Sequence, residues 1–189
     1  MADTPTSPFP TTTLAPAQTA WLKQFIRDIP DYPQPGILFR DITPLLQNGA
    51  ALRFVIETLA QRYRGVGIDQ VVGIESRGFI FGTPLAYVLN TGFVPVRKKG
   101  KLPGTVIEQE YALEYGTATL EIHTDAVRPG QRVLIVDDLL ATGGTTQGTV
   151  RLVERLGAEV ASLAFLIELT GLAGRVRLPG LDVFALLDY

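Results

Sequence analysis

Short aliphatic runs alternate along the chain with longer stretches in which apolar residues recur every three or four positions. The runs VVGI at 71–74 and VLIV at 133–136 are continuous, which is typical of strands that are covered on both faces. Each run leads through a glycine-containing loop into a predicted helix. This repeat of strand, loop and helix predicts an α/β domain built on a parallel sheet.

The same patterns predict further elements on both sides of these runs. Helical spacing from 50 to 64 predicts a helix with one buried stripe, and a shorter helix begins at Trp21. The proline-rich sequence DIPDYPQPG stops that shorter helix, and ILFRDITPLL follows as an extended segment. The run at 161–169 predicts another interior strand, and FVPV at 93–96 predicts a shorter one whose Pro95 indicates an edge or a bulge.

A polar segment and an alternating strand precede the second aliphatic run. In TATLEIH, at 117–123, apolar and polar residues alternate strictly, which predicts a half-exposed strand with Glu121 and His123 on its exposed face. The preceding KKGKLPGTVIEQEYALEYG is too polar and glycine-rich for a core segment. It predicts a long flexible loop or hairpin across the surface, and loops of this length often act as lids.

Composition indicates one domain with a loose N-terminal segment. At 189 residues with 46% hydrophobic content, the chain can bury the core of a single domain. The first twenty residues contain too few large apolar groups to offset the entropy of ordering them. We therefore expect a loose tail over 1–20 and one domain over 21–189.

Charge and cysteine content narrow the possible partners and location. A net charge of −2 gives no general field that would hold nucleic acid. The absence of cysteine excludes disulfides and thiolate zinc sites and is compatible with a reducing compartment. No apolar run approaches the roughly 18 residues of a membrane span. We expect a cytoplasmic protein with small-molecule ligands and neither a nucleic-acid nor a membrane partner.

The stretch VLIVDDLLATGGTT, at 133–146, combines two acids with a glycine turn. In a parallel sheet, ligands bind beyond the carboxyl ends of the strands, where Asp137 and Asp138 are expected. Gly143 and Gly144 let backbone N–H groups converge at the start of the next helix, which suits a phosphate. Because the lysine of GxxxxGK[ST] is missing, this is not the loop that binds nucleoside triphosphates.

Each half of this motif is, by itself, also typical of a strand end followed by an ordinary turn. At this spacing the two halves together favour a phosphorylated sugar, since its phosphate would bind the glycine loop and its ribose hydroxyls the two acids. The hydroxyl groups of Thr142, Thr145 and Thr146 add donors to the same segment.

The whole stretch closely resembles the phosphoribosyl-diphosphate-binding motif of the type I phosphoribosyltransferases. PGILFRDITPLL, ESRGFIFG, RKKGKLPG and LEYGTATLEIH resemble segments of the adenine phosphoribosyltransferases, so the resemblance covers about 21–189. It implies an α/β fold with a mainly parallel twisted sheet flanked by helices. It also implies a small N-terminal hood at about 30–48, a flexible β-hairpin lid at about 98–117, and phosphoribosyl contacts from Asp137, Asp138, Ala141, Thr142, Gly143, Gly144 and Thr145.

The resemblance places the diphosphate leaving group at two basic segments. ESRGFIFG follows the first aliphatic run, and the resemblance implies that Glu75, Ser76 and Arg77 bind diphosphate across a cis peptide between Glu75 and Ser76. A fixed guanidinium there would stabilise charge as it develops. From RKKGK, Arg97 and Lys101 are the expected diphosphate ligands, although a solvated basic patch is the alternative interpretation of that segment.

The expected adenine contacts come from the hood. A phenylalanine in an extended segment is usually part of a core, but the resemblance implies that Phe39 stacks on the purine. It also implies that the backbone of Leu38 and Arg40 reads the purine edge, and Leu139 could pack on the other face. A site that accepts a hydrogen bond from an exocyclic amine disfavours a 6-oxopurine, because buried groups are then left unpaired.

The remaining expected roles concern the lid and the metal. The resemblance implies that Glu114 is the acid/base near purine N7 and that Tyr115 belongs to the lid, with Glu114 and Arg77 as the catalytic pair. The single histidine, His123, is interpreted as incidental. Magnesium would be held mainly by substrate oxygens and water, so no direct protein ligand is expected.

The resemblance therefore implies magnesium-dependent transfer of the phosphoribosyl group to adenine by a homodimer, giving AMP and diphosphate in purine salvage. Two alternatives remain open on the sequence. One is a phosphoribosyltransferase for xanthine or another 6-oxopurine, which differs in its hood contacts. The other is a regulator that senses phosphoribosyl diphosphate without chemistry; the short, proline-rich segment before ILFRD argues against the DNA-binding module such proteins usually carry.

Overall fold

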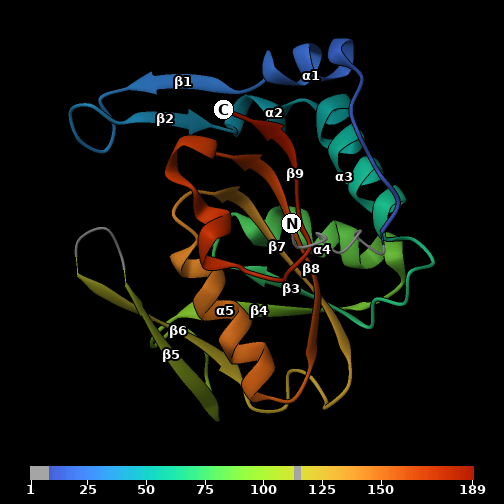
Figure 1. Ribbon diagram of the computed structural model, residues 1–189, viewed down its shortest axis with the longest axis vertical. Helices are drawn as coiled ribbons and strands as arrows, with labels where there is room; N and C mark the ends of the chain where they lie inside the picture. Colours follow the sequence, from blue (N-terminus) through green and yellow to red (C-terminus); the bar gives the residue numbers. More distant parts are fainter. Residues whose placement is uncertain (1–8, 113–115) are drawn as a thin grey trace, which may run out of the picture.

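The computed structural model describes residues 9–112 and 116–189. Within them, seven strands form one sheet in the order β5-β6-β4-β3-β7-β8-β9, and β1 and β2 form a separate antiparallel hairpin (Figure 1). The strands are β1 Arg27–Pro30, β2 Leu38–Asp41, β3 Gln70–Ile74, β4 Gly92–Lys98, β5 Val106–Ala112, β6 Thr117–His123, β7 Arg132–Leu140, β8 Glu159–Glu168 and β9 Val183–Asp188.

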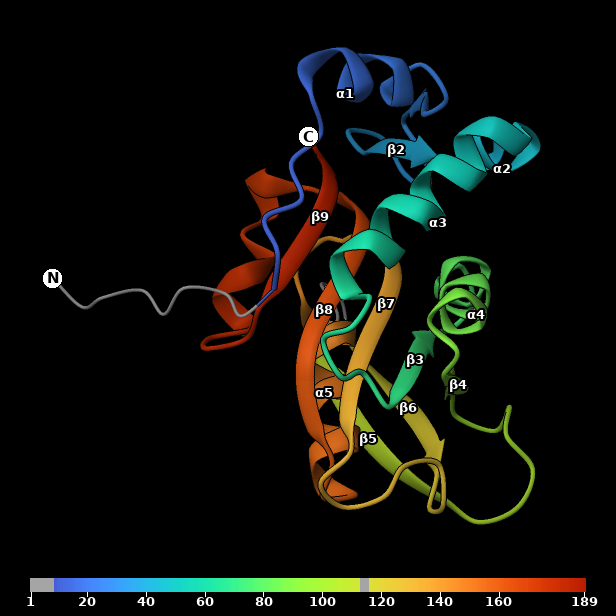
Figure 2. The ribbon, with the colours of Figure 1, turned by 90° about the vertical axis from the view of Figure 1, so that its right-hand side faces the viewer.

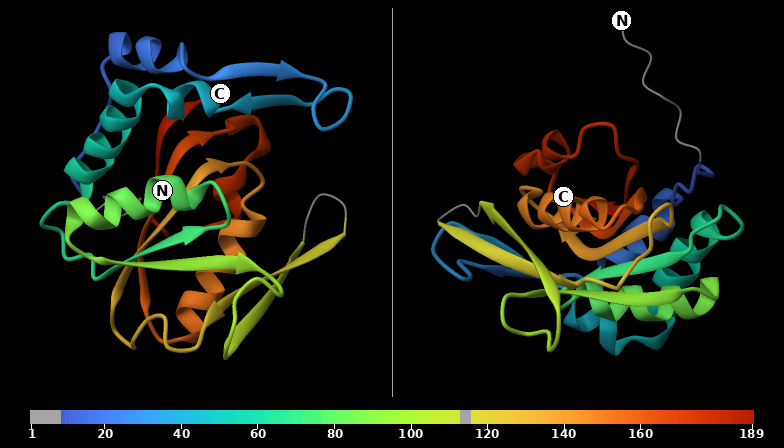
Figure 3. Two further views of the ribbon diagram at one scale, coloured as in Figure 1. Left: turned by 180° about the vertical axis from the view of Figure 1, so that it is seen from behind. Right: turned by 90° about the horizontal axis from the view of Figure 1, so that it is seen from below.

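Strands β4, β3, β7, β8 and β9 run parallel, whereas β6 is antiparallel to both β4 and β5. The helices cover both faces of this sheet, with α3 and α4 on one side and α5 on the other (Figures 2 and 3). The α-helices are α1 Pro16–Lys23, α2 Thr43–Gln47, α3 Gly49–Tyr63, α4 Gly78–Leu89 and α5 Gly144–Arg155, and two short 3-10 turns, η1 Thr170–Leu172 and η2 Gly174–Arg177, precede β9.

Strand β7 shows why the continuous aliphatic runs predict a two-sided sheet. Leu134 and Val136 pack in the core cluster beneath α3 and α4, whereas Val133 and Ile135 pack in the cluster beneath α5. All four side chains are fully buried because successive side chains of a strand point to opposite faces. The predicted α/β fold with a mainly parallel, helix-flanked sheet is confirmed.

Three details differ from the sequence-based expectations. Strand β7 continues through the two acids to Leu140, so the acids lie within the strand and not just after it. Pro95 lies in an interior strand, but it pairs there only with β3, since β6 joins β4 from Arg97 onward. The face of β6 that was expected to be exposed is covered at Glu121, which is 2% exposed.

Part of the segment expected to be a loose tail is packed against the domain. Helix α1 begins at Pro16, five residues before the expected start at Trp21. Further upstream, Phe9 is buried with its ring edge-on to Tyr63 at 5.4 Å, and the carbonyl of Pro10 accepts a hydrogen bond from Arg62 at 2.6 Å. A single aromatic side chain thus anchors a stretch whose average composition predicts no order.

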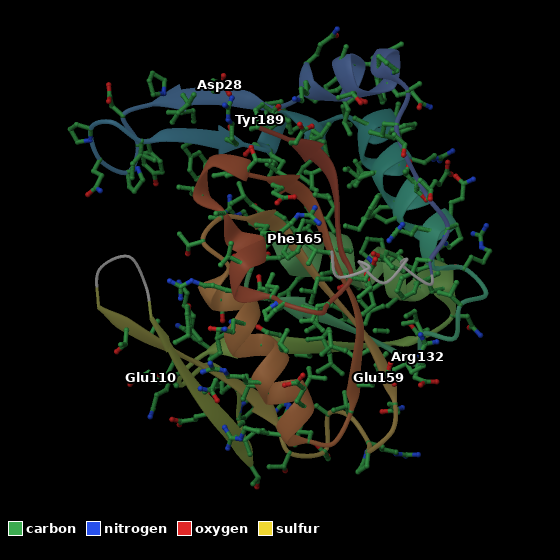
Figure 4. The ribbon with its side chains drawn as sticks, in the orientation of Figure 1. Asp28, Glu110, Arg132, Glu159, Phe165 and Tyr189 are labelled. Carbon is green, nitrogen blue, oxygen red and sulfur yellow. The ribbon has the colours of Figure 1, made fainter. Side chains whose placement is uncertain are left out.

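The β1–β2 hairpin is held against the carboxyl end of the main sheet. The guanidinium of Arg40, in β2, lies 4.0 Å from the ring centroid of Tyr189 and forms an ion pair with Asp28 of β1. Lys23 lies over the same tyrosine ring at 4.4 Å. Figure 4 shows Tyr189 next to the hairpin strand that carries Asp28. Within the described residues, no helix has the length and apolar character needed to cross a membrane.

Candidate active site

A polar cavity of about 330 Å³ opens at the carboxyl ends of β3 and β7 and the start of α5. It brings together side chains and backbone from five separate places in the sequence. The lining residues are Glu75, Arg77, Lys98, Tyr111, Leu120, Asp137, Asp138, Leu139, Ala141, Thr142, Gly143, Gly144, Thr145 and Thr146.

The loop before α5 forms one wall of this cavity. Gly143 adopts the left-handed conformation, with φ of 80°, and directly precedes the first residue of α5, Gly144. The first N–H groups of a helix have no partner within the helix, and together with the helix dipole they attract an anion. A phosphate bound here would therefore meet backbone donors and the hydroxyls of Thr142 and Thr145.

The η2 turn supports this loop from behind. A Cβ atom on Gly143 would lie 2.5 Å from the carbonyl oxygen of Gly174, and one on Gly174 would lie 2.3 Å from that of Ala141. Gln147 also donates a hydrogen bond to the carbonyl of Arg177 at 3.1 Å. The shape of the loop at 142–145 therefore depends on a backbone contact with the η2 turn, about thirty residues away in sequence.

We expect Gly174→Ala to destabilise the fold, because the added methyl group cannot fit against the Ala141 carbonyl. Overpacking of this kind costs about 1–3 kcal/mol, which corresponds to a decrease of about 2–12 °C in Tm. Gly171→Ala is the matched control, since its Cβ would meet no atom within 4 Å. Equal melting temperatures for the two variants in differential scanning calorimetry would contradict the close contact.

The two acids are held in an environment that opposes their ionisation. Burial and the charge of Asp138 raise the pKa of Asp137 well above its usual value. Burial also raises the pKa of Asp138, against the opposing effect of the Arg77 guanidinium, whose Nη1 lies 3.0 Å from Asp138 Oδ2. Gly78, at the start of α4, packs so closely that its Cβ would lie 3.0 Å from Asp137 Oδ1. A cation or a hydrogen-bond donor at these carboxylates would favour their charged forms and lower both pKa values.

Arg77 also lines a second cavity, of about 450 Å³, beneath the β1–β2 hairpin. Its guanidinium carbon lies 5.5 Å from the ring centroid of Phe39. The other lining residues are mainly apolar or aromatic: Ile29, Tyr32, Phe39, Asp41, Ile42, Thr43 and Leu46. One arginine thus connects an anion-binding cavity to a cavity suited to a flat, apolar ring system.

Comparison with known proteins identifies the family of the chain. The phosphoribosyl transferase domain model matches residues 41–182. The adenine phosphoribosyltransferase of Acaryochloris marina is 62% identical over 168 residues, which is 89% of this chain and 99% of that protein. The chain belongs to the adenine phosphoribosyltransferase family.

Solved structures of the family agree with this fold. The adenine phosphoribosyltransferase of Thermoanaerobacter pseudethanolicus is 54% identical and superposes with a TM-score of 0.88 over 90% of this chain and 99% of its own. The Saccharomyces cerevisiae enzyme, solved with adenine and an imino-altritol bisphosphate, is 42% identical, with a TM-score of 0.84 over 89% of this chain and 98% of its own.

The structure brings most of the residues expected to bind the phosphoribosyl group and diphosphate to the first cavity. All seven residues assigned to the phosphoribosyl group line it, as do Glu75 and Arg77. Leu139, expected to pack on the adenine, lines this first cavity and not the second, so its expected role stays a prediction. The peptide between Glu75 and Ser76 is cis, as the family resemblance implies. Ser76 itself is exposed and does not contribute to the lining.

The two basic residues favoured on sequence are not brought to this cavity. Arg97 Nε lies 3.2 Å from Glu75 Oε2, and its Nη1 donates to the carbonyl of Lys101 at 3.0 Å. Neither Arg97 nor Lys101 lines either cavity, whereas Lys98 lines the first. The alternation of side chains along β4 could have identified Lys98. It follows Val94 and Val96 at intervals of two residues, so it lies on the same side of the sheet as these two, the α5 side.

The hood residues are divided between two faces of β2. Phe39 lines the second cavity, but the side chains of Leu38 and Arg40 do not, because they point to the opposite face. Leu38 is 44% exposed, and Arg40 is held by Asp28 and the ring of Tyr189. Their expected role uses backbone groups, so it stays a prediction.

Sequence reasoning missed several lining residues. The clearest is Tyr32, whose ring lies edge-on to Phe39 at 5.2 Å between centroids. In the first cavity, Tyr111 comes from β5. Tyr111 had no signal in the sequence beyond its place in the polar hairpin. Glu114 and Tyr115 lie outside the described residues, so the roles expected for them stay predictions.

Proposed function

We propose that this protein transfers the 5-phosphoribosyl group from phosphoribosyl diphosphate to adenine and releases AMP and diphosphate, as a purine salvage enzyme. The observation that carries the proposal is that Arg77 lines both the anion-binding cavity and the aromatic cavity. A base in one cavity and a phosphorylated sugar in the other would meet at this arginine. Membership of the adenine phosphoribosyltransferase family supports the same reaction.

In the first cavity, the loop at 142–145 binds the 5-phosphate and the two acids accept hydrogen bonds from the ribose hydroxyls. Such bonds favour the ionised carboxylates and therefore offset the burial that raises the pKa of both acids. Arg77 lies at the junction of the two cavities, where it binds the departing diphosphate. Among the described residues, Arg77 forms one ion pair, with the buried Asp138.

The reaction forms a bond from N9 of adenine to C1 of the ribose and breaks the bond from C1 to the diphosphate oxygen. Adenine loses one imidazole proton during the transfer, and Glu114, the expected acid/base near N7, is proposed to accept it. Positive charge develops on the sugar ring and negative charge on diphosphate, so fixed groups of opposite sign stabilise the transition state. The second cavity orients the purine through Phe39 and Tyr32. Holding the purine in the reactive geometry lowers the entropic part of the activation barrier.

Magnesium is proposed as the cofactor, and the donor set of the first cavity fits it. Mg²⁺ prefers oxygen ligands and usually binds through one or two carboxylates, substrate phosphates and water. Asp137 and Asp138 lie beside the proposed phosphate site, where they would bind water on an ion held mainly by substrate oxygens. The described residues contain no group of three or more acidic, histidine or cysteine side chains that could enclose a metal. Bound with diphosphate, the ion would offset the charge of the leaving group.

We also propose that the protein is a homodimer and that it is cytoplasmic. Helix α4 exposes three apolar side chains, Ile80, Tyr87 and Val88, of which Tyr87 is 86% exposed. Clusters of exposed apolar side chains are typical of protein–protein interfaces. This helix is therefore the surface at which a second copy is proposed to bind.

The proposal predicts AMP formation from phosphoribosyl diphosphate and magnesium with adenine but not with hypoxanthine, guanine or xanthine. Each base is offered separately, and the nucleotide product is measured by chromatography. Turnover of a 6-oxopurine in place of adenine would contradict the base assignment and favour the alternative phosphoribosyltransferase. Tight binding of phosphoribosyl diphosphate without turnover of any base would favour a regulator and overturn the proposal.

A further inference from the structure

Glu121 is a buried carboxylate outside both cavities. It lies in β6 with 2% of its surface exposed, although its alternating sequence context predicts an exposed side chain. Its two oxygens accept hydrogen bonds from three consecutive backbone N–H groups: Gly100 at 3.0 Å, Lys101 at 2.8 Å and Leu102 at 2.6 Å. The turn that follows β4 is thus wrapped around one charged group from another strand.

The carboxylate is ionised despite its burial. Burial opposes the charge on Glu121, but the three N–H donors and the nearby Arg97 more than offset this effect and lower the pKa below its usual value. A buried charge is costly to replace or to leave without partners. The turn and the carboxylate therefore stabilise each other, and neither holds the same geometry alone.

A second carboxylate holds the other end of the same segment. Glu75 Oε2 accepts a hydrogen bond from the backbone N–H of Lys98 at 2.9 Å and lies 3.2 Å from Arg97 Nε. Arg97 in turn donates to the carbonyl of Lys101 at 3.0 Å. Residues 97–102 are therefore fixed by two carboxylates, one at each end, with Arg97 between them.

The side chain that this arrangement presents to the first cavity is that of Lys98. Its backbone N–H is bound by Glu75, and its carbonyl accepts a hydrogen bond from Lys101, whose own N–H also faces Glu121. The position of Lys98 thus depends on the Glu121 carboxylate through the turn at 100–102. We propose that Glu121 is a positioning residue for the diphosphate end of the active site, acting through the turn at 100–102 on Lys98.

This inference rests on the proposed function, because Lys98 is taken to bind the diphosphate of phosphoribosyl diphosphate. If the backbone of Lys98 is already ordered in the free protein, diphosphate binds without the entropic cost of ordering it. Loss of the Glu121 charge is therefore expected to weaken binding of phosphoribosyl diphosphate and of free diphosphate. Adenine binding is expected to remain unchanged, because neither Glu121 nor residues 97–102 line the second cavity.

The test uses Glu121→Gln in the full chain. The glutamine oxygen can still accept from Lys101 and Leu102, but its amide nitrogen would face the N–H of Gly100, so donor meets donor. We expect KM for phosphoribosyl diphosphate and Kd for diphosphate to rise about 10-fold or more, as is typical when a hydrogen bond to a charged group is lost. KM for adenine should change less than about 2-fold if the coupling is local to the turn.

Glu108→Gln is the matched control. Glu108 lies on the neighbouring strand and contacts the same segment through the side chain of Lys99 at 2.6 Å, but this pair is exposed. The Glu108→Gln substitution also removes one negative charge, but it does not affect a hydrogen bond to the backbone of the turn. KM for phosphoribosyl diphosphate should therefore stay unchanged. A second variant, Gly100→Ala, perturbs the turn alone, because Gly100 has φ of +79° and its Cβ would meet no atom within 4 Å.

Three results would overturn the inference: unchanged diphosphate affinity in Glu121→Gln, equal increases in KM for both substrates, or a similar effect in Glu108→Gln. If Glu121→Gln does not fold, Gly100→Ala decides, and unchanged KM for phosphoribosyl diphosphate in that variant would overturn it. Failure of the proposed function is distinguishable, because the unmodified chain itself would then form no AMP from adenine, whereas failure of this inference appears only in the variants.

Discussion

Replacing Asp137 or Asp138 with asparagine is expected to lower kcat/KM for phosphoribosyl diphosphate by about 10²-fold. Each carboxylate is proposed to accept a hydrogen bond from a ribose hydroxyl, and a hydrogen bond to a charged group contributes about 1.5–3 kcal/mol. Asparagine keeps the volume but loses the charge and one acceptor. Steady-state kinetics with adenine at saturation measures the effect, and Asp125→Asn, an exposed residue outside both cavities, is the control.

The same substitution at Asp137 is expected to stabilise the fold. Burial and the adjacent Asp138 charge raise the pKa of Asp137, so the native state binds its proton more tightly than the unfolded state does. Its contribution to stability is therefore fully present below the unfolded pKa, near 3.8, and is lost as pH rises through the folded value. Asp137→Asn removes this loss and should raise Tm at pH 8 relative to the unmodified chain.

Thermal unfolding between pH 4 and pH 8, together with the kinetics above, tests whether Asp137→Asn gains stability while it loses activity. The advantage of Asp137→Asn should grow with pH, whereas Asp125→Asn should follow the unmodified chain throughout. An asparagine variant that kept full activity would contradict the proposed ribose contact. A variant with lower Tm at pH 8 would contradict the unfavourable burial of the Asp137 charge.

The parts of the site that the sequence predicts are those determined by neighbours along the chain. The run at 133–136 is buried on both faces because a strand alternates its side chains, and the loop at 142–145 precedes a helix because its glycines permit that turn. These relations span only a few residues. Periodicity and turn chemistry are therefore enough to predict them.

The parts that the sequence did not predict depend on partners far away in the chain. Arg97 was favoured as a diphosphate ligand, but Glu75, 22 positions earlier, holds its guanidinium. Glu121 was expected to be exposed, but the turn at 100–102 folds over it. Gly174 supports the phosphate loop from a segment to which no role was assigned. A local pattern cannot identify which distant group will cover or bind a side chain.

The segment ESRG, residues 75–78, connects the two cavities, because its Arg77 lines both of them. It begins at the carboxyl end of β3, between β4 and β7, so Glu75 contacts the basic segment and Arg77 contacts the acids. Helix α4 begins directly afterwards and packs closely on β7 at Gly78. Arg77 can therefore reach Asp138 on one side and the ring of Phe39 on the other.

Arg77→Ala is accordingly expected to lower kcat by about 10²–10³-fold, as is typical when one fixed donor to developing charge is removed. It should also raise KM for adenine, because the guanidinium lines the second cavity beside Phe39. Arg77→Lys should recover little of the loss, since an ammonium group cannot reproduce the planar, bidentate contact of arginine with phosphate oxygens. Arg151→Ala, in the exposed part of α5, is the control.

The pH dependence of Arg77→Ala separates this role from a general loss of structure. Arg77 opposes the effect of burial on the pKa of Asp138, so without it that pKa rises further. If the ionised acids bind the ribose, activity appears only after they lose their protons, and the acid limb of kcat/KM should move to higher pH in Arg77→Ala. Arg77→Lys retains a positive charge near Asp138 and should shift this limb less. An acid limb at the same pH in all three proteins would show that Arg77 does not act on the acids.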